Sequence, residues 1–506
     1  MQLRKHTGKY NLKTMHYIQA TDRSEIKLFA EVENWVSHHN PIRLIDLIVE
    51  KTICSNPDEF IWKGESNTGR KSYSPATLLK LLLYGYLNKI ASSRRMEAET
   101  YRNIELLWLL GELHPDHWTI CQYRRNNEKH IRFVTIEFRK FLITEGYIDG
   151  KVVATDGSKF KAYASKDMLS LKNIEKRLDK VNEKLDEYLQ EIKKADSIEE
   201  LTEEFADNFE GVDINKELIG KIADLQEQVS KLESQKSQLE NAGKTYLAPN
   251  DPDANLMKSR DGKIPAYNIQ TVIDKKNRMI ATSELTTNSN DIEELKTNLD
   301  NLAQQLDIIP QTIEADTGYS NMQQIKEIEE NTETKCFIPL PKNHKREEDK
   351  KAEIEFTYDE ENDEYHCSQG NTLKLKSKNV KQRNKFYNVY QCTQCDDCPL
   401  RAKCTKSKKG RIYKRNINQK WIESYKKRMR EEYSKQKIAE RKTIVEHPFG
   451  TIKWMMGKFH FLLTRKEKVQ IEIDLYSTAY NFKRLINIDT MSLLLQKAEN
   501  YAWKRI

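Results

Sequence analysis

The sequence predicts an α/β protein with a mixed sheet, preceded by a helical N-terminal region and interrupted by two insertions. Apolar runs of strand length end near Asp156 and Asp316, and two more flank a polar turn at 274–278. Helical repeats of apolar residues occupy the first 145 positions and return after the first predicted strand. Five of the eight cysteines gather between positions 367 and 404. Strands and helices in this order indicate an α/β core.

Length and composition limit the class of protein. A chain of 506 residues is too long for one compact core, so we expect three or four units. The longest apolar run, Leu78–Leu87, contains Lys80 and is about half the roughly 20 residues that a membrane-spanning helix needs. The N-terminus has no signal-like apolar region. We therefore expect a cytoplasmic protein with no membrane partner.

The net charge of +8 is unevenly distributed. Residues 374–430 carry nineteen Lys or Arg against three Asp or Glu, whereas residues 175–240 carry ten against nineteen. A polyanion would bind the first segment and avoid the second.

These patterns divide the chain into six segments. They are a helical DNA-binding region at 1–145, core pieces at 146–170, 246–340 and 418–506, an antiparallel coiled coil at 171–245, and a cysteine-rich basic insertion at 341–417.

The N-terminal segment has clear helix signals. One helix is expected from Pro41 and another from Ser74–Pro75. A short helix that begins after Asp116 and ends in Arg124 and Arg125 follows a helix and a glycine turn, which fits a helix-turn-helix whose second helix contacts a major groove. The alternative is an ordinary surface helix with solvated arginines.

Residues 171–245 predict two helices of similar length. Apolar residues such as Ile174, Leu178, Leu232 and Leu239 recur at spacings of three and four, with a break near 207–213. An antiparallel hairpin follows from this pattern, and it serves either as a spacer or as a dimer contact.

The chain then returns to β structure. Runs at Ala266–Ile273 and Met279–Leu285 predict a hairpin, followed by a helix from about Asp291 to Leu306 and a strand at Thr312–Ala315.

Asp156, Asp316 and Glu446 each end or follow an apolar run, and they are the candidate catalytic residues. Carboxylates suit Mg²⁺, and two such ions can activate an attacking oxygen and stabilise a leaving one in phosphodiester chemistry. The alternative is that acidic residues often end strands without binding metal.

Three blocks around these residues carry a resemblance. Thr155–Ser158, Ala315–Ser320 and Val445–Lys453 resemble the active-site blocks of bacterial insertion-sequence DDE transposases, and among them the eleven-eighty-two family of the IS-four-like group. Further matches at Leu79–Asn88, Pro115–His117, Asp251–Asp253 and Cys395–Arg401 extend it over about residues 40 to 490.

The resemblance implies a fold and an activity. It implies a ribonuclease-H-like core in which Asp156 lies on the first strand, Asp316 on the fourth and Glu446 on a later helix. These residues would bind two Mg²⁺ or Mn²⁺ ions, and water and then a 3′-hydroxyl would attack DNA at element ends and target. Partners would be double-stranded DNA, with terminal inverted repeats, and a second copy of the chain, in a bacterial, nucleoid-associated setting.

Related transposases have basic residues around the glutamate. Lys453 stands seven residues after Glu446, two helical turns on, and would point toward phosphate. Arg441 and Lys442 both lie near the arginine position of the signature, and Arg441 offers bidentate geometry. Pro448 favours a helix start or a kink at Glu446. We expect His447 to orient or pack, since hard Mg²⁺ sites seldom use imidazole.

The cysteine segment predicts a second metal site. Four thiolates drawn from Cys367, Cys392, Cys395, Cys398 and Cys404 would suit one structural, tetrahedral Zn²⁺, as in a zinc ribbon. The alternatives are no metal or an iron–sulfur cluster, for which the fourth cysteine is misplaced. Nearby cations could follow DNA phosphates or simply be solvated: Lys408, Lys409, Arg411, Lys414 and Arg415.

The function that these observations favour is that of a DNA transposase which cuts element ends and joins them to target DNA. The alternatives are a catalytically inactive, metal-stapled DNA-binding protein and a DDE nuclease without strand transfer.

Overall fold

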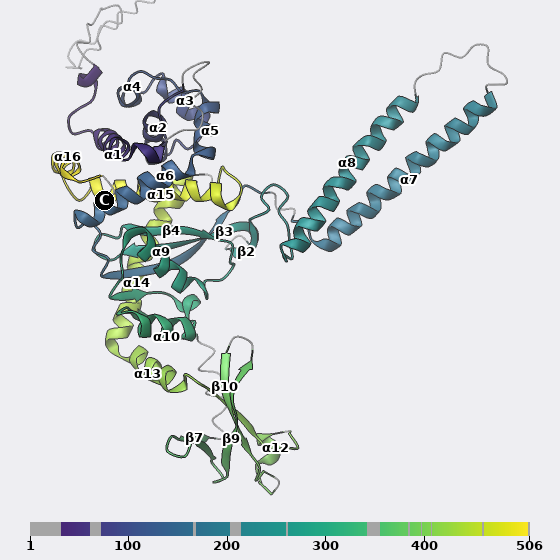
Figure 1. The fold of residues 1–506 in the computed structure, drawn as a ribbon, viewed down its shortest axis with the longest axis vertical. Helices are drawn as coiled ribbons and strands as arrows, with labels where there is room; N and C mark the ends of the chain where they lie inside the picture. Colours follow the sequence, from purple (N-terminus) through teal and green to yellow (C-terminus); the bar gives the residue numbers. More distant parts are fainter. Residues whose placement is uncertain are drawn as a thin grey trace, which may run out of the picture.

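The computed structural model describes residues 32–60, 72–164, 168–202, 214–259, 262–341, 355–382, 385–395, 397–405, 407–457 and 460–503. Helices from both ends of the chain form one end of the molecule, a mixed sheet lies at the centre, and a small β unit forms the other end (Figure 1). A long helical hairpin projects to one side (Figure 1).

The N-terminal region is helical, as predicted. Its elements are η1 (Val32–Trp35), α1 (Ile42–Ser55), η2 (Pro57–Phe60), α2 (Pro75–Leu87), α3 (Ser93–Thr100), α4 (Ile104–Leu110), α5 (His117–Asn126) and α6 (Glu128–Thr144). The predicted caps are present: Ser74 Oγ accepts the Thr77 N–H, and Asp116 Oδ1 accepts the Thr119 N–H at 2.8 Å. Gly111, at φ 59°, ends α4 in the left-handed conformation.

The last helices complete the core of this region. Helix α15 (Lys466–Ile486) packs against α2 and α6, and α16 (Met491–Asn500) packs against α1. Tyr86 and Tyr476 meet edge to face with ring centroids 4.7 Å apart, and the Asn56 side chain donates to the Trp503 carbonyl. Residues from both ends of the chain therefore share one hydrophobic cluster.

The central sheet is mixed. Its strands are β1 (Val152–Lys161), β2 (Asn255–Ser259), β3 (Gly262–Asp274), β4 (Ile280–Thr286), β5 (Thr312–Glu314) and β6 (Lys335–Phe337). The order is β2-β3-β1-β5-β6, with β4 also paired to β3; β1, β5 and β6 are parallel, and the pairs with β3 are antiparallel. This mixed α/β arrangement fits the ribonuclease-H-like core that the resemblance implies.

One strand differs from the prediction. We expected the first strand to end at Asp156, but β1 continues to Lys161. The extension pairs with β3 up to Lys161 and Ala266, and Phe160 is buried beside Phe449 and Phe461. Antiparallel pairing and aromatic burial therefore carry the strand past the carboxylate.

Helices cover both faces of the sheet. Val153 and Ile313 face a cluster with α9 (Glu294–Leu306), α10 (Met322–Asn331) and α13 (Gln419–Arg430). Ala154 and Phe160 face the other cluster, which contains buried residues of α14 (Glu432–Met456). A 3-10 turn, η3 (Thr317–Tyr319), follows β5. Alternate residues of β1 thus point toward α14.

The insertion after β1 consists of α7 (Leu171–Thr202) and α8 (Ile214–Asn241), which pack together as a hairpin (Figure 1). At its base, Leu169 pairs with Leu247, and Ile174 and Leu239 are buried between the helices. The predicted turn near 207–213 lies outside the described residues.

The cysteine-rich insertion forms a separate antiparallel sheet. Its elements are β7 (Phe356–Asp359), β8 (Glu364–Cys367), β9 (Thr372–Gln382), β10 (Lys385–Cys392), α12 (Arg401–Cys404) and β11 (Ile412–Asn416), with strands in the order β11-β10-β9-β8-β7. Helix α13 connects it to α14. Among the described helices, none has the length and hydropathy needed to cross a membrane.

Candidate active site

Asp156 lies on β1, and Asp316 lies two residues beyond the end of β5, the parallel neighbour of β1. The β1–β5 register pairs Val152 with Thr312 and Ala154 with Glu314, so each aspartate stands two residues beyond the last pair. Neighbouring strands are about 4.8 Å apart, and residues two apart point to the same face. Both carboxylates therefore leave the sheet on the α14 side. Asp316 also accepts the Gly318 N–H at 2.8 Å, which fixes its side chain.

The surroundings of Asp156 are electrostatically unusual. Its pKa is raised to about 6, chiefly by burial and also by the negative charges of Asp316 and Asp291, while the Arg441 guanidinium opposes the shift. The Arg441 guanidinium lies 3.5 Å from Asp156 Oδ2, and the Gly157 N–H donates to Oδ1 at 2.9 Å. Several carboxylates held close together create a negative potential that a cation would relieve.

Asp291 is a third acidic residue at this place, and sequence reasoning missed it. It accepts hydrogen bonds from Asn268 at 2.6 Å and Gln270 at 2.7 Å, and lies 3.2 Å from the Lys159 ammonium. A Cβ at Gly157 would lie 2.4 Å from its Oδ1, so only glycine leaves it room. The sequence feature that could have pointed to Asp291 is the polar run 286–291 after β4, but such a run is also typical of an ordinary loop.

In the described structure, Glu446 makes no direct polar contact with the two aspartates. It is exposed in the middle of α14, and Pro448 lies inside the helix, so of the two predicted alternatives the helix start is wrong and a kink at Glu446 stays a prediction. Among the described residues, no hydrogen bond or ion pair links Glu446 to Asp156 or Asp316, and the three do not form a group with all ligand atoms within 4.8 Å of one another.

Glu446 does lie between two residues that contact β1. Arg441 pairs with Asp156, and Lys453 donates to Ser158 Oγ at 2.9 Å. Lys453 and Glu446 share one side of the helix, about 10 Å apart along its axis. The glutamate is thus carried by a helix packed over the strand that bears the first aspartate. Lys442 is exposed.

A second ion pair holds α14 to the sheet. Lys437 lies 3.7 Å from Glu314, whose side chain is fully buried and whose pKa burial raises to about 7. Lys437 and Arg441 are one helical turn apart, and Glu314 and Asp156 occupy the same face of neighbouring strands. His447 Nδ1 bonds the Tyr480 hydroxyl at 3.1 Å, a contact that fits an orienting or packing role.

Two family models match the chain. A model described as a transposase DDE domain matches residues 366–486, and a model described as a transposase domain (DUF772) matches residues 30–126. The first match covers the cysteine-rich unit and α14 with Glu446, and the second covers α1 to α5. No curated protein and no solved structure matched the chain.

Together, the two matches support an insertion-sequence DDE transposase.

Two predicted DNA contacts, Arg124 and Arg125, have different environments. Arg124 is 3 % exposed and donates to the Tyr86 hydroxyl and, at 2.7 Å, to the Ala91 carbonyl. Its prediction as a DNA contact is therefore wrong, because it is enclosed by α2 and the following loop. Arg125 is exposed on α5 and stays a prediction.

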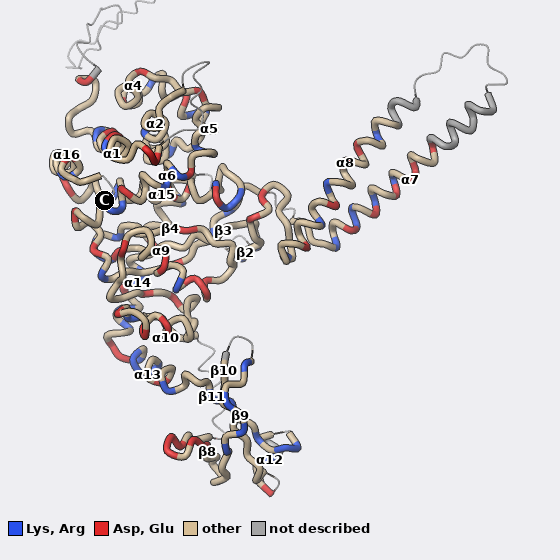
Figure 2. The backbone as a smooth tube through the Cα atoms, viewed as in Figure 1, with Lys and Arg blue, Asp and Glu red and all other residues tan. Residues whose placement is uncertain are grey.

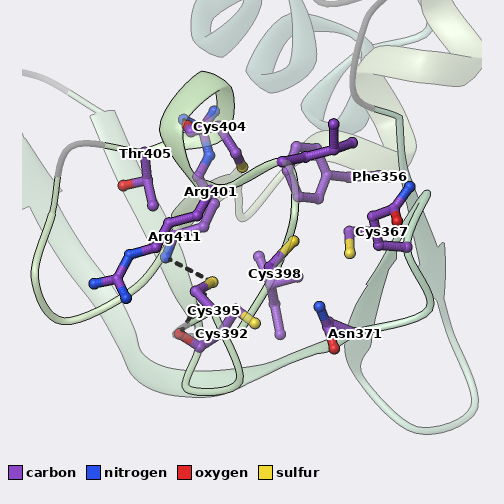
Figure 3. Close-up of a pocket in the computed structure, with 13 residues that line it drawn as sticks. Phe356, Cys367, Asn371, Cys392, Cys395, Cys398, Arg401, Cys404, Thr405 and Arg411 are labelled. Carbon is purple, nitrogen blue, oxygen red and sulfur yellow. Dashed lines mark hydrogen bonds between the residues drawn. The ribbon is translucent and has the colours of Figure 1, made fainter.

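The five clustered cysteines line one cavity of about 20 Å³ (Figure 3). They come from β8, the end of β10, the following loop and α12. The Arg411 N–H donates to Cys395 Sγ at 3.4 Å, and burial beside other thiols raises the pKa of Cys392 to about 11. A backbone donor and neutral, crowded thiols fit a site that a cation would convert to thiolates.

The basic residues around the cysteines divide into two kinds. Lys408, Lys409 and Lys414 are exposed. Arg415 stacks 3.7 Å above the Tyr358 ring, and Arg411 donates to the Cys404 carbonyl at 2.7 Å. Both arginines pack within the unit and are partly exposed, so their contact with phosphate stays a prediction. Figure 2 shows Lys and Arg concentrated along α13 and this unit.

Within the described part of the chain, one group of possible ligands lies within 4.8 Å of one another: Asp359, Glu364 and His366. His366 Nε2 is 3.4 Å from Glu364 and 3.8 Å from Asp359. The three residues come from β7 and β8 and do not include any of the predicted site residues.

Proposed function

We propose that the transposase cuts DNA at the ends of its element and joins them to target DNA at a site built on Asp156, Asp316 and Glu446. The register of β1 and β5, which puts two carboxylates side by side, is the observation that carries this proposal. Mg²⁺ or Mn²⁺ would supply the activation of the attacking oxygen and the stabilisation of the leaving oxygen.

The protein residues would divide the work. Asp156 and Asp316 would hold the cations as fixed, partly desolvated carboxylates, and Glu446 would complete the ligand set from α14. Arg441, released from Asp156 by the cations, would bind the scissile phosphate with its planar guanidinium. Lys453, anchored at Ser158, would hold a neighbouring phosphate.

The acidic trio is tested by neutral substitutions of equal size. We expect Asp156→Asn, Asp316→Asn and Glu446→Gln each to reduce Mg²⁺-dependent cleavage of a plasmid that carries the element at least about 1,000-fold. DNA affinity and the thermal unfolding temperature should stay close to those of the parent. Glu440→Gln is the matched control, since Glu440 is an exposed residue of the same helix paired with Lys275. Full cleavage by one of the three variants would remove that residue from the site.

Strand transfer separates the proposal from its alternatives. A pre-cut element end with a free 3′-hydroxyl, incubated with a circular target and Mg²⁺, should become covalently joined to the target. Cleavage without joining would support a nuclease. Binding of element ends without either product would support an inactive DNA-binding protein.

We propose that the cysteine pocket binds one structural Zn²⁺. Five thiols from separate elements line one small cavity, which supports this; no three of these described thiols lie within 4.8 Å of one another, so binding would draw them together. Purified protein should contain about one zinc per chain. Cys395→Ala should remove it and lower the unfolding temperature of the small β unit, while Cys54→Ala, which changes an exposed cysteine elsewhere, should not. Metal-free parent protein of full stability would refute the proposal.

A further inference from the structure

Helix α14 presents an exposed line of residues that continues from the glutamate. Lys442, Glu446, Gly450 and Trp454 follow one another at intervals of four, so they lie along one side of the helix. All four are exposed, and nothing lies within 4 Å of where a Cβ on Gly450 would be. Glu446 and Trp454 are about 12 Å apart along the helix axis, and between them Gly450 leaves this line without a side chain.

Trp454 lies at the end of this line among cations. Its side chain is 56 % exposed, an unusual position for an indole. The Lys89 ammonium lies over the ring, and the Lys483 ammonium is 5.0 Å from the ring centroid. These lysines come from the loop after α2 and from α15, so three distant parts of the chain build the cluster.

We propose that this line binds a single DNA strand, with an unpaired base stacked on Trp454 and its phosphates on Lys89 and Lys483. The proposal rests on the proposed function, because the strand would run over Gly450 to the phosphate held near Glu446. At about 3.4 Å per stacked nucleotide, 12 Å corresponds to three or four nucleotides. Trp454 would therefore take a base close to the cut.

The chemistry of the cluster selects this occupant. An exposed indole stacks with every base, and ammonium groups beside it attract phosphates, which is how proteins bind single strands without sequence preference. Bases inside a duplex stack on each other and offer only their edges, so they cannot use the ring face. DNA opened near the element end would offer such a base.

Binding to a 20-nucleotide oligothymidine, measured by fluorescence anisotropy without divalent ions, tests the proposal. We expect Trp454→Ala to weaken binding about 10-fold and Trp454→Phe to retain most of it. Tyr433→Ala is the matched control, since Tyr433 is 59 % exposed on the same helix, and its affinity should be unchanged. Equal losses in Trp454→Ala and Tyr433→Ala would overturn the proposal.

Gly450→Leu provides a second, independent test. The substitution meets no neighbour and replaces a poor helix former, so the thermal unfolding temperature should stay constant or rise. It nevertheless places a side chain in the path of the strand and should weaken oligothymidine binding severalfold. Unchanged binding by this variant would contradict the path over Gly450.

Photocrosslinking locates the base directly. An oligothymidine with one 5-iodouracil should crosslink to the tryptic peptide 454–458 of the Asp156→Asn variant. A crosslink elsewhere would overturn the proposal. Since this variant and the absence of metal preclude cleavage through the proposed site, the result is independent of whether the acidic trio is catalytic.

Discussion

At the scale of single residues, Glu472 is a buried carboxylate whose ionised form destabilises the fold. Its side chain is fully buried, Oε1 accepts the N–H groups of Leu462 and Leu463, and Oε2 has no hydrogen-bond partner. Burial raises its pKa to about 7, although Arg124 opposes the shift. A carboxyl whose pKa is raised by folding stabilises the protein below the unfolded-state pKa of about 4.5, and this contribution is lost as pH rises to about 7.

Glu472→Gln should remove that pH dependence. The amide keeps the acceptor for both N–H groups and cannot ionise. Between pH 4.5 and 7.5, the free energy of unfolding of the variant should rise relative to the parent by about 3 kcal/mol. Urea unfolding at several pH values measures this, with Glu467→Gln, an exposed residue of the same helix, as control. A constant difference between variant and parent would contradict the assigned shift.

Residue types alone predicted part of the site. The two aspartates were found because each follows a strand-like run, and the structure gives them matching register. The sequence does not distinguish Arg124 from Arg125. Arg124 is buried because it packs against Tyr86, a contact that only the tertiary structure reveals. Glu314 and Asp291 were missed because a glutamate within a strand and an aspartate in a loop reveal nothing until partners such as Lys437 and Lys159 are placed.

At the scale of elements, local signals predicted helix starts well, since Ser74 and Asp116 act through residues only three positions away. The length of β1 and the course of α14 through Pro448 depend on distant partners, namely β3 and the hydrophobic cluster under the helix. Short-range patterns cannot contain that information.

The α7–α8 hairpin gives a prediction at this scale. The Lys236 ammonium lies 3.3 Å from the Glu175 carboxylate, so the two helices are close at this point. A five-residue glycine–serine linker between Glu175 and Lys236 can therefore replace residues 176–235. The base cluster with Ile174 and Leu239 is kept, so the unfolding temperature should change by less than about 3 °C. We expect the molar mass measured by light scattering to fall only by the mass removed from each chain, with the oligomeric state unchanged. A molar mass that falls to half would instead identify the hairpin as a dimer contact.

At the scale of the whole molecule, charge is segregated. The cysteine-rich unit and α13 are basic, whereas the projecting hairpin carries both signs (Figure 2). DNA should therefore bind along the basic end of the molecule rather than along the hairpin.

Salt dependence tests this division. Replacing Lys408, Lys409 and Lys414 by Gln should reduce the slope of log affinity against log salt by about 2 to 3, because each phosphate contact contributes about 0.9. The control replaces three exposed hairpin lysines: Lys176, Lys180 and Lys184. Its slope should equal that of the parent. If the slope of the control falls by as much as that of the first variant, the basic unit has no special role in DNA binding.

The hydrophobic core that the N-terminal and C-terminal helices share affects when the protein can fold during synthesis. Helices α1, α2 and α6 emerge early from the ribosome, but their apolar faces are covered only when α15 and α16 follow. A nascent polypeptide therefore has no finished N-terminal helical region until α14, with Glu446, has also been synthesised. Under the proposed function, shortened products of translation or proteolysis would therefore not fold into competitors that occupy element ends without cutting them.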